Sequence, residues 1–536
     1  PKTPNQKRKY GELNKRLAKY VMLVESIYED LNLEAAKIVG ITDFTIDSDR
    51  TFMWSDYPQT RKRIRDLQER FVEDIGSVIY SGTSEEWKNS NEVQDLLANK
   101  VLQTYGATIG KEKYEILYQP NNDALKAFQQ RKDKGFTISD KLWNQSTLYK
   151  QELEEAISCA IQKGTSAITL SKQISKYLLD FPQLQKDYKE RFGKASRAMD
   201  CEYRSIRLAA SEINMAYRQA ENLRWQQMDF VVGYEIKLSN NHTCNGKPFQ
   251  DICDILAGKY PKDFQWTGWH PLCRCYKIPI LKTEEEFWEW DGRNEATTAS
   301  VNEVKDVPDA FKKWVLDNQE RISTAKKRNT LPYFLRDNKS VYQKITVESS
   351  ISEIVKRASS VGDEVQSIAE RIAIKNGGYV TPINFKSTTS ITRKVITEGI
   401  TPYDIKDAVR TTIIVPKSRI EDVLEELYKT EGFLRLKRQK PESFMGYSGN
   451  IVNIRTTNGL TAEIQVNTER MIFAKERPED AKRILGKKRW EEIHNETGME
   501  GGLGHKYYEQ WRILDKSSNE ALKIVEKSIE YYSHFR

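Results

Sequence analysis

The spacing of apolar residues changes clearly along the first half of the chain. From about Lys9 to Phe230, apolar residues recur at three- and four-residue intervals, as in LNKRLAKYVMLVESIYEDL and SIRLAASEINMAYRQAENLRW, which predicts a mainly helical segment. From residue 231 the run VVGYEIKLS alternates as a strand does, and a loop rich in Cys, His, Gly and aromatic residues follows it to about residue 281. The pattern therefore predicts helices with a compact irregular module at 231–281.

The second half of the chain has a different pattern of apolar and polar residues. Residues 286–345 include the polar stretch NEATTASVNE and the basic stretch KKRNTLPYFLRDNK without sustained periodicity, so we expect a linker there. After residue 346, helical spacing alternates with β-branched runs at TTIIV and NIVNIRT. This order predicts an α+β domain over 346–536, which is a usual domain size.

Length and composition agree with a multidomain protein. A chain of 536 residues exceeds what one hydrophobic core usually supports. It contains no apolar run of the ~18 residues that a membrane span needs, and its basic start lacks a secretory apolar stretch, so we expect a cytoplasmic protein without membrane contact. The net charge of +8 is modest for this length, and it permits contact with nucleic acid without requiring it.

Cysteine and histidine residues crowd into the irregular module. The cluster comprises His242, Cys244, Cys253, His270, Cys273 and Cys275. A tetrahedral zinc ion needs four such ligands, and the set Cys253, His270, Cys273 and Cys275 is the one we expect. The spacing matches no standard pair of Cys-x-x-Cys motifs, and buried apolar cysteines beside hydrogen-bonded histidines would explain the same residues.

The residues around this module carry a family resemblance. The run LSNNHTCNGKPFQDICDILAGKYPKDFQWTGWHPLCRCYKIPIL, preceded by RLAASEINMAYRQAENLRWQQMDFVVGYEI, resembles the Mu F domain of phage head morphogenesis proteins. The resemblance covers about residues 20–285, so we assign residues 1–285 to such a domain. It implies a minor head protein that contacts portal and capsid proteins, travels inside the virion and reaches the host cytoplasm with the DNA.

Cations and a carboxylate precede the first β-branched run of the last domain. In FKSTTSITRKV, Ser387 or Thr388 is a candidate helix cap, and the side chains that follow at helical intervals would form one polar face. These side chains are Lys386, Ser390, Arg393 and Lys394. The face would bind a triphosphate or would be an ordinary solvated stripe. In DIKDAVRTTIIV, Asp407 lies where a strand begins, a good place for a metal ligand, while Arg410 would bind phosphate or pair with Asp407.

A hairpin follows these segments. The dipeptide Asn458-Gly459 between alternating runs predicts a two-residue turn. In the second strand, Ala462, Ile464 and Val466 would face the core, and Glu463, Gln465 and Asn467 would face away from it, toward an active site or toward water. Just upstream, Tyr447 is placed to stack on a base. Further on, GGLGHKYYEQWR contains His505, which reaches substrate or simply packs.

Taken in order, these segments resemble the synthetase domain of the RelA/SpoT family over about residues 346–515. The resemblance implies a nucleotidyltransferase-like α+β fold, with a mixed sheet flanked by helices. It implies that Asp407 and Glu463 hold Mg²⁺, with Glu463 also a candidate base. The residues that would bind ATP or the acceptor are Lys386, Ser390, Arg393, Lys394, Arg410, Lys437, Tyr447, Gln465 and His505.

The chain departs from the family pattern at three positions. Thr412 stands where the family has Arg, Asn467 follows the Glu-Ile-Gln strand in place of Arg, and Asn450 lies near the position of a missing His. These departures affect phosphate binding and acceptor choice, and they leave both carboxylates in place.

The two resemblances together imply a phage-borne pyrophosphokinase toxin. It would move pyrophosphate from ATP to a nucleotide or to the 3′ end of tRNA, and an immunity protein or antitoxin would restrain it. The basic run LRLKRQK, which contains Lys437, would contact tRNA, flank the ATP site or be solvated. The alternative is a purely structural head protein whose C-terminal domain has lost activity.

Overall fold

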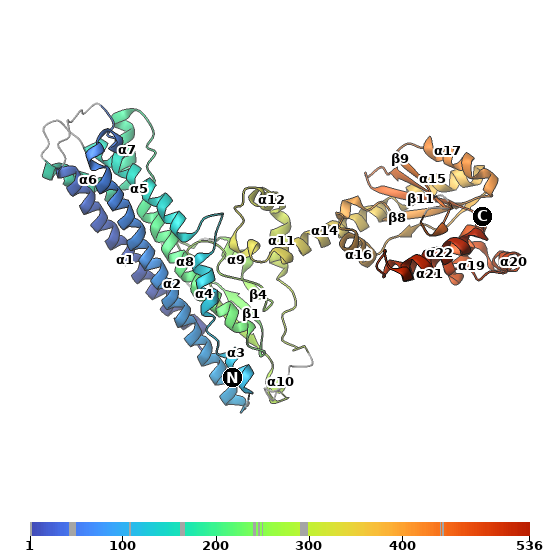
Figure 1. The fold of residues 1–536 in the computed structure, drawn as a ribbon, viewed down its shortest axis with the longest axis horizontal. Coiled ribbons are helices and arrows are strands. Elements are labelled where there is room, and N and C mark those ends of the chain that lie inside the picture. Colours follow the sequence, from blue (N-terminus) through green and yellow to red (C-terminus); the bar gives the residue numbers. More distant parts are fainter. Residues whose placement is uncertain are drawn as a thin grey trace. The chain divides into compact units, whose positions relative to one another are not determined.

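The computed structural model describes two compact units joined within one helix. It describes residues 3–41, 50–106, 109–160, 167–239, 243–244, 247–248, 250–289, 299–439, 441 and 444–536. The first unit is Pro1–Tyr342 and the second is Gln343–Arg536. Helix α14 (Lys339–Ser360) runs from one unit into the other (Figure 1).

The first unit is mainly helical. Its other helices are α1 (Gln6–Ile41), α2 (Arg61–Tyr105), α3 (Lys111–Leu117), α4 (Asn122–Gln130), α5 (Ile138–Ala160), α6 (Ala167–Leu179), α7 (Phe181–Phe192), α8 (Cys201–Gln226), α9 (Ile252–Leu256), α10 (Glu284–Glu289), α11 (Asp309–Asp317), α12 (Gln319–Lys327) and α13 (Tyr333–Arg336), with short 3-10 turns η1 (Trp54–Asp56) and η2 (Pro58–Thr60). The helical prediction for the first 230 residues is confirmed. No described helix is both long and apolar enough to span a bilayer.

Long helices pack along one another to make the main core of this unit. Helices α1, α2, α5 and α8 lie side by side (Figure 1). Rings such as Phe71 and Tyr149, stacked at 5.5 Å between centroids, fill the space between them. Buried polar side chains tie the helices together: the fully buried Arg224 of α8 pairs with Asp95 of α2 at 2.6 Å. Because buried charged residues are paired in this way, they can lie inside a bundle whose apolar residues recur at helical intervals.

A small antiparallel sheet follows α8, as the alternating run at residue 231 predicted. Its strand order is β4-β1-β5, with β1 (Val231–Lys237), β4 (Gly258–Tyr260) and β5 (Tyr276–Leu281). A two-stranded ribbon, β2 (Thr243–Cys244) with β3 (Lys247–Pro248), also belongs to this module. His242 lies outside the described residues, and the side chain of Cys244 is not described either.

Much of the expected linker is folded. Helices α11, α12 and α13 lie within 286–345 and belong to the first unit. Phe311 and Phe334 are buried there, and their rings meet Trp269 of the Cys/His module at 6.5 and 5.2 Å. A few aromatic residues replace sustained periodicity as the driving force, because each buries a large apolar area. The expected division into 1–285, 286–345 and 346–536 remains a prediction, and the compact units divide at residue 342.

The second unit contains a six-stranded mixed sheet. Its order is β6-β8-β11-β10-β9, with β7 also paired to β8. Strands β8 and β11 are parallel, and the other pairs are antiparallel. The strands are β6 (Tyr379–Val380), β7 (Asn384–Phe385), β8 (Val409–Ile414), β9 (Phe433–Arg438), β10 (Asn450–Arg455) and β11 (Thr461–Asn467).

Helices surround this sheet and leave part of one face polar. They are α15 (Gly362–Lys375), α16 (Thr388–Glu398), α17 (Ile420–Tyr428), α18 (Glu469–Lys475), α19 (Pro478–Leu485), α20 (Lys487–Thr497), α21 (Leu503–Arg512) and α22 (Asn519–Ser533), with 3-10 turns η3 (Pro402–Asp404), η4 (Lys417–Arg419) and η5 (Phe444–Gly446). Ala462, Ile464 and Val466 are fully buried in the core with residues of α15 and α17, as the alternation predicted. Helices α18, α20 and α22 contribute to a second, smaller core.

The hairpin between β10 and β11 exists, but its turn is longer than predicted. Arg455 pairs with Thr461, and the amide of Thr456 donates to the carbonyl of Leu460. Gly459 alone in this turn has a positive φ, of 79°. A two-residue type I′ turn needs positive φ at both central residues, so the two-residue form is wrong, and the geometry is that of a three-residue loop with glycine in the left-handed position.

Candidate active site

The predicted carboxylates lie at the same end of two adjacent parallel strands. Asp407 precedes β8 by two residues, and Glu463 of β11 is in register with Arg410 of β8. On the polar face of the sheet, the register continues from Glu463 to Asn453 of β10 and Arg435 of β9. A second row along the same face contains Thr412, Gln465 and Lys437. The strand pattern thus gathers the predicted polar residues on one surface.

Asp407 is held between two ammonium groups. Its Oδ2 accepts from Lys386 Nζ at 2.5 Å, and its Oδ1 accepts from Lys394 Nζ at 3.0 Å. Burial raises the pKa of Asp407, but the two lysines outweigh burial and lower it below its usual range. The carboxylate is therefore ionised, as a metal ligand must be, and the cluster already concentrates positive charge beside it.

The helix that carries Lys394 begins where the sequence predicted. Ser387 caps α16, accepting from the Ser390 amide at 3.2 Å. Lys386 lies before the cap and is fixed by its amide, which donates to the carbonyl of Ala408 at 2.9 Å. Lys386 and Lys394 therefore converge on Asp407 from a loop and a helix. The expectation of a single helical face was incomplete, since Lys386 is not part of the helix.

Asn453 joins the two segments that bear the carboxylates. This buried side chain donates at 3.3 Å to the carbonyl of Lys406, next to Asp407. It also donates at 3.3 Å to the carbonyl of Ala462, next to Glu463. Sequence reasoning missed Asn453, because its partners lie 47 and 9 residues away in the chain. The Asn453 amide therefore fixes the position of the segment that leads into β8 relative to β11.

A chain of hydrogen bonds orients Glu463. Lys475 Nζ donates to Gln465 Oε1 at 2.7 Å, and Gln465 Nε2 donates to Glu463 Oε1 at 2.7 Å. The ammonium group accepts nothing, so it fixes the direction in which the Gln465 amide points. Burial lowers the pKa of Lys475, but Tyr447 and Glu476 outweigh burial and raise it. Lys475 is thus a charged positioning group that no sequence signal indicated.

Tyr447 lies beside this chain of hydrogen bonds. Its ring is 5.5 Å from Lys475 Nζ, and its hydroxyl donates to Asn467 Oδ1 at 2.9 Å. Arg410 and His505 lie near Glu476: burial raises the pKa of that carboxyl, but Lys475, Arg410 and His505 outweigh burial and lower it. His505 Nε2 is buried without a hydrogen-bond partner among the described residues. The structure therefore brings Tyr447, Gln465, Arg410 and His505 to one neighbourhood.

Other predicted residues lie further from the carboxylates. Arg393 is exposed and lines a shallow groove with threonines of α16, away from the side that Lys394 presents to Asp407. Ser390 Oγ is 3.0 Å from Ser387 Oγ, within the cap. Lys437 is exposed on β9, in register with Ile451. Of the predicted phosphate-binding cations, Lys386 and Lys394 are those that the structure brings to Asp407.

The donor set fits a magnesium ion. Mg²⁺ prefers carboxylate oxygens and keeps several waters, so two carboxylates suffice. Glu463 uses Oε1 for Gln465, and no hydrogen bond to its Oε2 is present among the described residues. Asp407 and Glu463 are thus the residues that would hold the ion. Its bound charge would neutralise phosphate oxygens.

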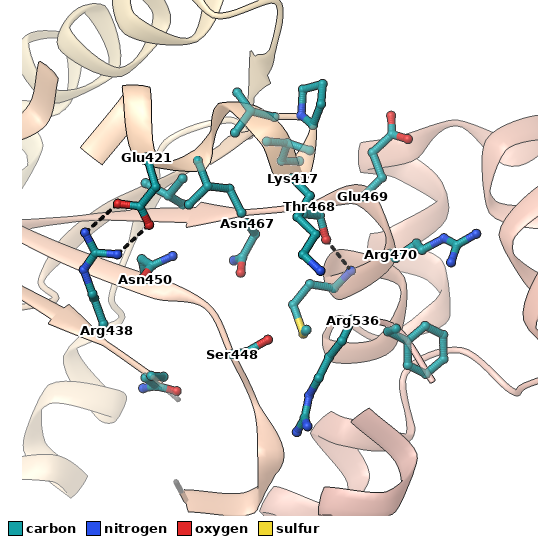
Figure 2. Close-up of a pocket in the computed structure, with 18 of the residues that line it drawn as sticks. Lys417, Glu421, Arg438, Ser448, Asn450, Asn467, Thr468, Glu469, Arg470 and Arg536 are labelled. Carbon is teal, nitrogen blue, oxygen red and sulfur yellow. Dashed lines mark hydrogen bonds and ion pairs between the residues drawn. The ribbon is translucent and has the colours of Figure 1, made fainter. Parts of the chain in front are cut away.

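A large pocket of the second unit lies at the opposite end of the parallel strands. It has a volume of about 860 Å³, and residues 414–415 and 466–468 line it, beyond the strand ends that face away from Asp407. Figure 2 shows Arg438 paired with Glu421 on one side of this pocket and Arg536 and Arg470 on the other. Glu463 is four residues before Asn467 on β11, about 13 Å along a strand. The pocket is therefore separate from the carboxylates.

Comparison with known proteins supports a synthetase domain. Over 181 residues, 34% of the chain, the sequence is 36% identical to the (p)ppApp synthetase toxin Tas1 of Pseudomonas aeruginosa (strain UCBPP-PA14). This third of the chain is homologous to part of that toxin. The match covers 41% of the toxin's own length. The matched length is close to that of the second unit, where all the segments that resemble the synthetase family lie, and this unit is called the synthetase domain below because of that resemblance.

Two solved structures are similar to part of the chain. The crystal structure of the complex between the type VI effector Tas1 and its immunity protein matches 35% of this chain and 97% of the solved chain, at 36% identity and a TM-score of 0.33. The small alarmone synthetase 1 from Bacillus subtilis matches 34% and 91%, at 17% identity and a TM-score of 0.22. Both TM-scores are low, so support for the synthetase domain rests on sequence identity. No family model matches the chain, and the resemblance to head morphogenesis proteins gains no support from these comparisons.

On the function proposed below, we expect Asn453→Ala to slow the reaction of the second unit without unfolding it. Losing the amide frees the carbonyls of Lys406 and Ala462, so the two carboxylates are no longer held in register. A misplacement of about 1 Å costs roughly 100-fold in rate. The Mg²⁺ concentration that gives half-maximal rate should rise with it. Asn376→Ala, which removes another buried asparagine of the same unit, should leave the Mg²⁺ dependence unchanged. An equal effect of both substitutions would show general loss of structure.

On the same proposed function, Lys475→Met is expected to weaken use of the acceptor substrate. Without the ammonium group the Gln465 amide can turn, and Glu463 loses its fixed donor. One hydrogen bond to a charged group is worth about 1.5–3 kcal/mol, or roughly 10- to 100-fold in kcat/KM for the acceptor. The KM for ATP should change little. Lys482→Met, which removes a lysine packed over Trp490, is the matched control. Unchanged acceptor kinetics in Lys475→Met would contradict this role.

Proposed function

We propose that the synthetase domain transfers the β,γ-pyrophosphate of ATP to a ribose hydroxyl of an adenosine nucleotide. The observation that carries the proposal is the convergence of Asp407, its two lysines and the oriented Glu463 at one end of β8 and β11. The adenosine acceptor is proposed because the homologous toxin is a (p)ppApp synthetase. Guanine nucleotides and the 3′ end of tRNA are the alternative acceptors.

The proposed reaction needs few chemical groups. The acceptor oxygen attacks the β-phosphorus of ATP, and the bond from that phosphorus to the oxygen bridging to the α-phosphorus breaks, so AMP leaves. The hydroxyl proton passes to the Glu463 carboxylate, which Gln465 and Lys475 hold in place. Lys386 and Lys394 turn from Asp407 to the ATP phosphates. Catalysis then rests on positioning and on stabilising negative charge.

Tyr447, Arg410 and His505 are the acceptor-side residues of this proposal. Tyr447 offers a ring for stacking on the base. Arg410 offers a positive charge to phosphates, and His505 offers a ring nitrogen that has no hydrogen-bond partner among the described residues. Three other predicted residues would contact substrate only if the substrate extends beyond the carboxylates: Arg393, Ser390 and Lys437. A tRNA, which extends far beyond the site, would be such a substrate.

For the first unit we propose the role of a minor phage head protein that carries the toxin. The resemblance of residues 20–285 to head morphogenesis proteins supports it. Portal and capsid proteins would be its partners, the virion and then the host cytoplasm its locations. A cognate immunity protein is proposed because the homologous effector forms such a complex. Purified virions should contain the chain, protected from added protease; its absence from virions would contradict this role.

The rival function is a structural head protein with an inactive C-terminal domain. Thr412 favours it, because this residue is in register with Gln465 where the resembled family places Arg. Expression of the full chain in bacteria separates the two. An active toxin should arrest growth, with loss of ATP and appearance of a pyrophosphorylated nucleotide in extracts, and Glu463→Gln should abolish both. Normal growth with an unchanged nucleotide pool would support the rival.

A further inference from the structure

We propose that Cys253, His270, Cys273 and Cys275 bind one structural zinc ion in the first unit. The sequence offered these residues only as a count of ligand types. The structure brings three of them together: Cys253 Sγ, His270 Nε2 and Cys273 Sγ all lie within 4.8 Å of one another. Cys253 comes from α9, and the others come from the segment that leads into β5. The ion would join α9 to the segment that leads into β5.

The distances fit a tetrahedral ion. With Zn–S bonds of 2.3 Å, two thiolates of one tetrahedral site are about 3.8 Å apart. Cys253 Sγ and Cys273 Sγ are 3.8 Å apart. His270 Nε2 is 3.1 Å from Cys253 Sγ, so it would move outward by only about half an ångström to take its place. Cys275 would be the fourth ligand: it is buried and interacts with both other thiols, and its Sγ lies outside the group of three atoms that lie within 4.8 Å of one another.

The hydrogen bonds of His270 suit a metal ligand. Its Nδ1 lies 2.7 Å from the carbonyl oxygen of Pro271, which can only accept, so Nδ1 carries a proton. In the neutral ring, Nε2 therefore carries the lone pair, and it faces the Cys253 thiol at 3.1 Å. A hydrogen bond from the distant ring nitrogen is the usual support of a metal-binding histidine. One oxygen of Asp251 lies 3.4 Å from Nε2, and its other oxygen caps α9. Asp251 would not bind the ion directly.

A buried arginine supplies the matching charge. Arg218 of α8 is 1% exposed and donates to the carbonyls of Thr267, Cys273 and Cys275 at 2.7–3.0 Å. No carboxylate among the described residues forms a direct ion pair with it; the buried Glu221 acts on it at longer range and is itself paired with Lys277. A buried charge without a directly paired counter-ion is costly. Three thiolates and one histidine around Zn²⁺ carry a net charge of −1, which would neutralise Arg218 and give this residue its partner.

The set of donors selects the metal. Three sulfur ligands and one imidazole in a tetrahedron suit zinc, and a site with all four positions filled by protein is structural. The segment from Pro261 to Cys275 has no helix or strand, and Leu272 within it has a positive φ of 61°. Zinc would fix this irregular segment. The proposal does not depend on the activity of the second unit.

Metal analysis of the full chain tests the proposal. The chain should be purified without metal-affinity steps or chelators, and it should contain about one zinc ion per molecule. Cobalt exchanged into the site should give the intense visible bands of tetrahedral Co²⁺ and thiolate charge-transfer absorption. Cys273→Ser should lower the zinc content to less than about a tenth. Cys159→Ser, which changes a buried cysteine of α5, should keep the full content.

A milder variant guards against misfolding. His270→Gln should fold, because the His270 side chain is 36% exposed, and it should release zinc to a chelator faster than the unchanged chain does. Retention of all the zinc by Cys273→Ser would overturn the assignment. A metal-free chain that takes up no cobalt, or a disulfide between Cys253 and Cys273 found by mass spectrometry, would overturn it as well.

Discussion

Replacing Glu463 by Gln is expected to reduce pyrophosphate transfer about 10²- to 10⁴-fold, the usual contribution of a positioned general base. The amide keeps the size of the side chain and can still meet Gln465, so the fold should hold. It cannot take a proton from the acceptor, and it is a poorer ligand for Mg²⁺. Steady-state rates at saturating ATP and acceptor measure the effect.

A matched carboxylate provides the control. Glu421 lies in the same unit, is exposed, and pairs with Arg438 beside the large pocket. Glu421→Gln should retain the rate within about twofold, because an exposed ion pair contributes little. If both substitutions leave transfer unchanged, Glu463 is not part of the reaction. If both abolish it, the effect comes from the fold.

Asp407→Asn is expected to reduce pyrophosphate transfer about as much as Glu463→Gln does. It should also lower the free energy of unfolding. The substitution leaves Lys386 and Lys394 partly buried without their carboxylate. Because both lysines keep some exposure, the free energy of unfolding should fall by only about 1–2 kcal/mol. Denaturant unfolding of the second unit, followed together with transfer rates, measures both effects.

The loss of stability should depend on pH in a defined direction. The folded pKa of Asp407 is depressed, so its stabilisation is fully present above the unfolded value of about 3.9. It is lost as pH falls through the lower folded pKa. The difference in stability between the unchanged chain and Asp407→Asn should therefore be constant near pH 7 and shrink below about pH 4. A difference that grows on acidification would show that the carboxyl is not held by the lysines.

Local pattern was sufficient for the parts of the site that belong to one strand or one cap. The alternation in β11 placed Glu463 and Gln465 opposite the core, and the β-branched run after Asp407 placed that carboxylate at a strand start. Ser387 was recognisable as a cap, because its hydroxyl accepts from an amide three residues on. Each of these features depends on neighbours within a few residues.

The remaining parts depend on contacts that a local pattern does not contain. Asn453 acts through carbonyls on two other segments, and Lys475 through an amide ten residues away. Arg393 shares the helix of Lys394, but only Lys394 lies on the side that Asp407 approaches. Phe311 and Phe334 fold the expected linker through rings of the Cys/His module. Such contacts are set by the tertiary fold.

Transfer of label from ATP tests the central claim most directly. The purified full chain should be incubated with Mg²⁺ and γ-labelled ATP, with AMP, ADP, ATP, GDP, GTP and bulk tRNA offered in parallel. The account predicts that label appears in a pyrophosphorylated adenosine nucleotide distinct from the starting ATP. This product should form together with an equal amount of AMP, and Glu463→Gln should not form it. Label on a guanine nucleotide or on tRNA would keep the reaction and change the acceptor. A folded chain that binds ATP but labels none of these acceptors, or releases AMP equally with Glu463→Gln, would contradict the account.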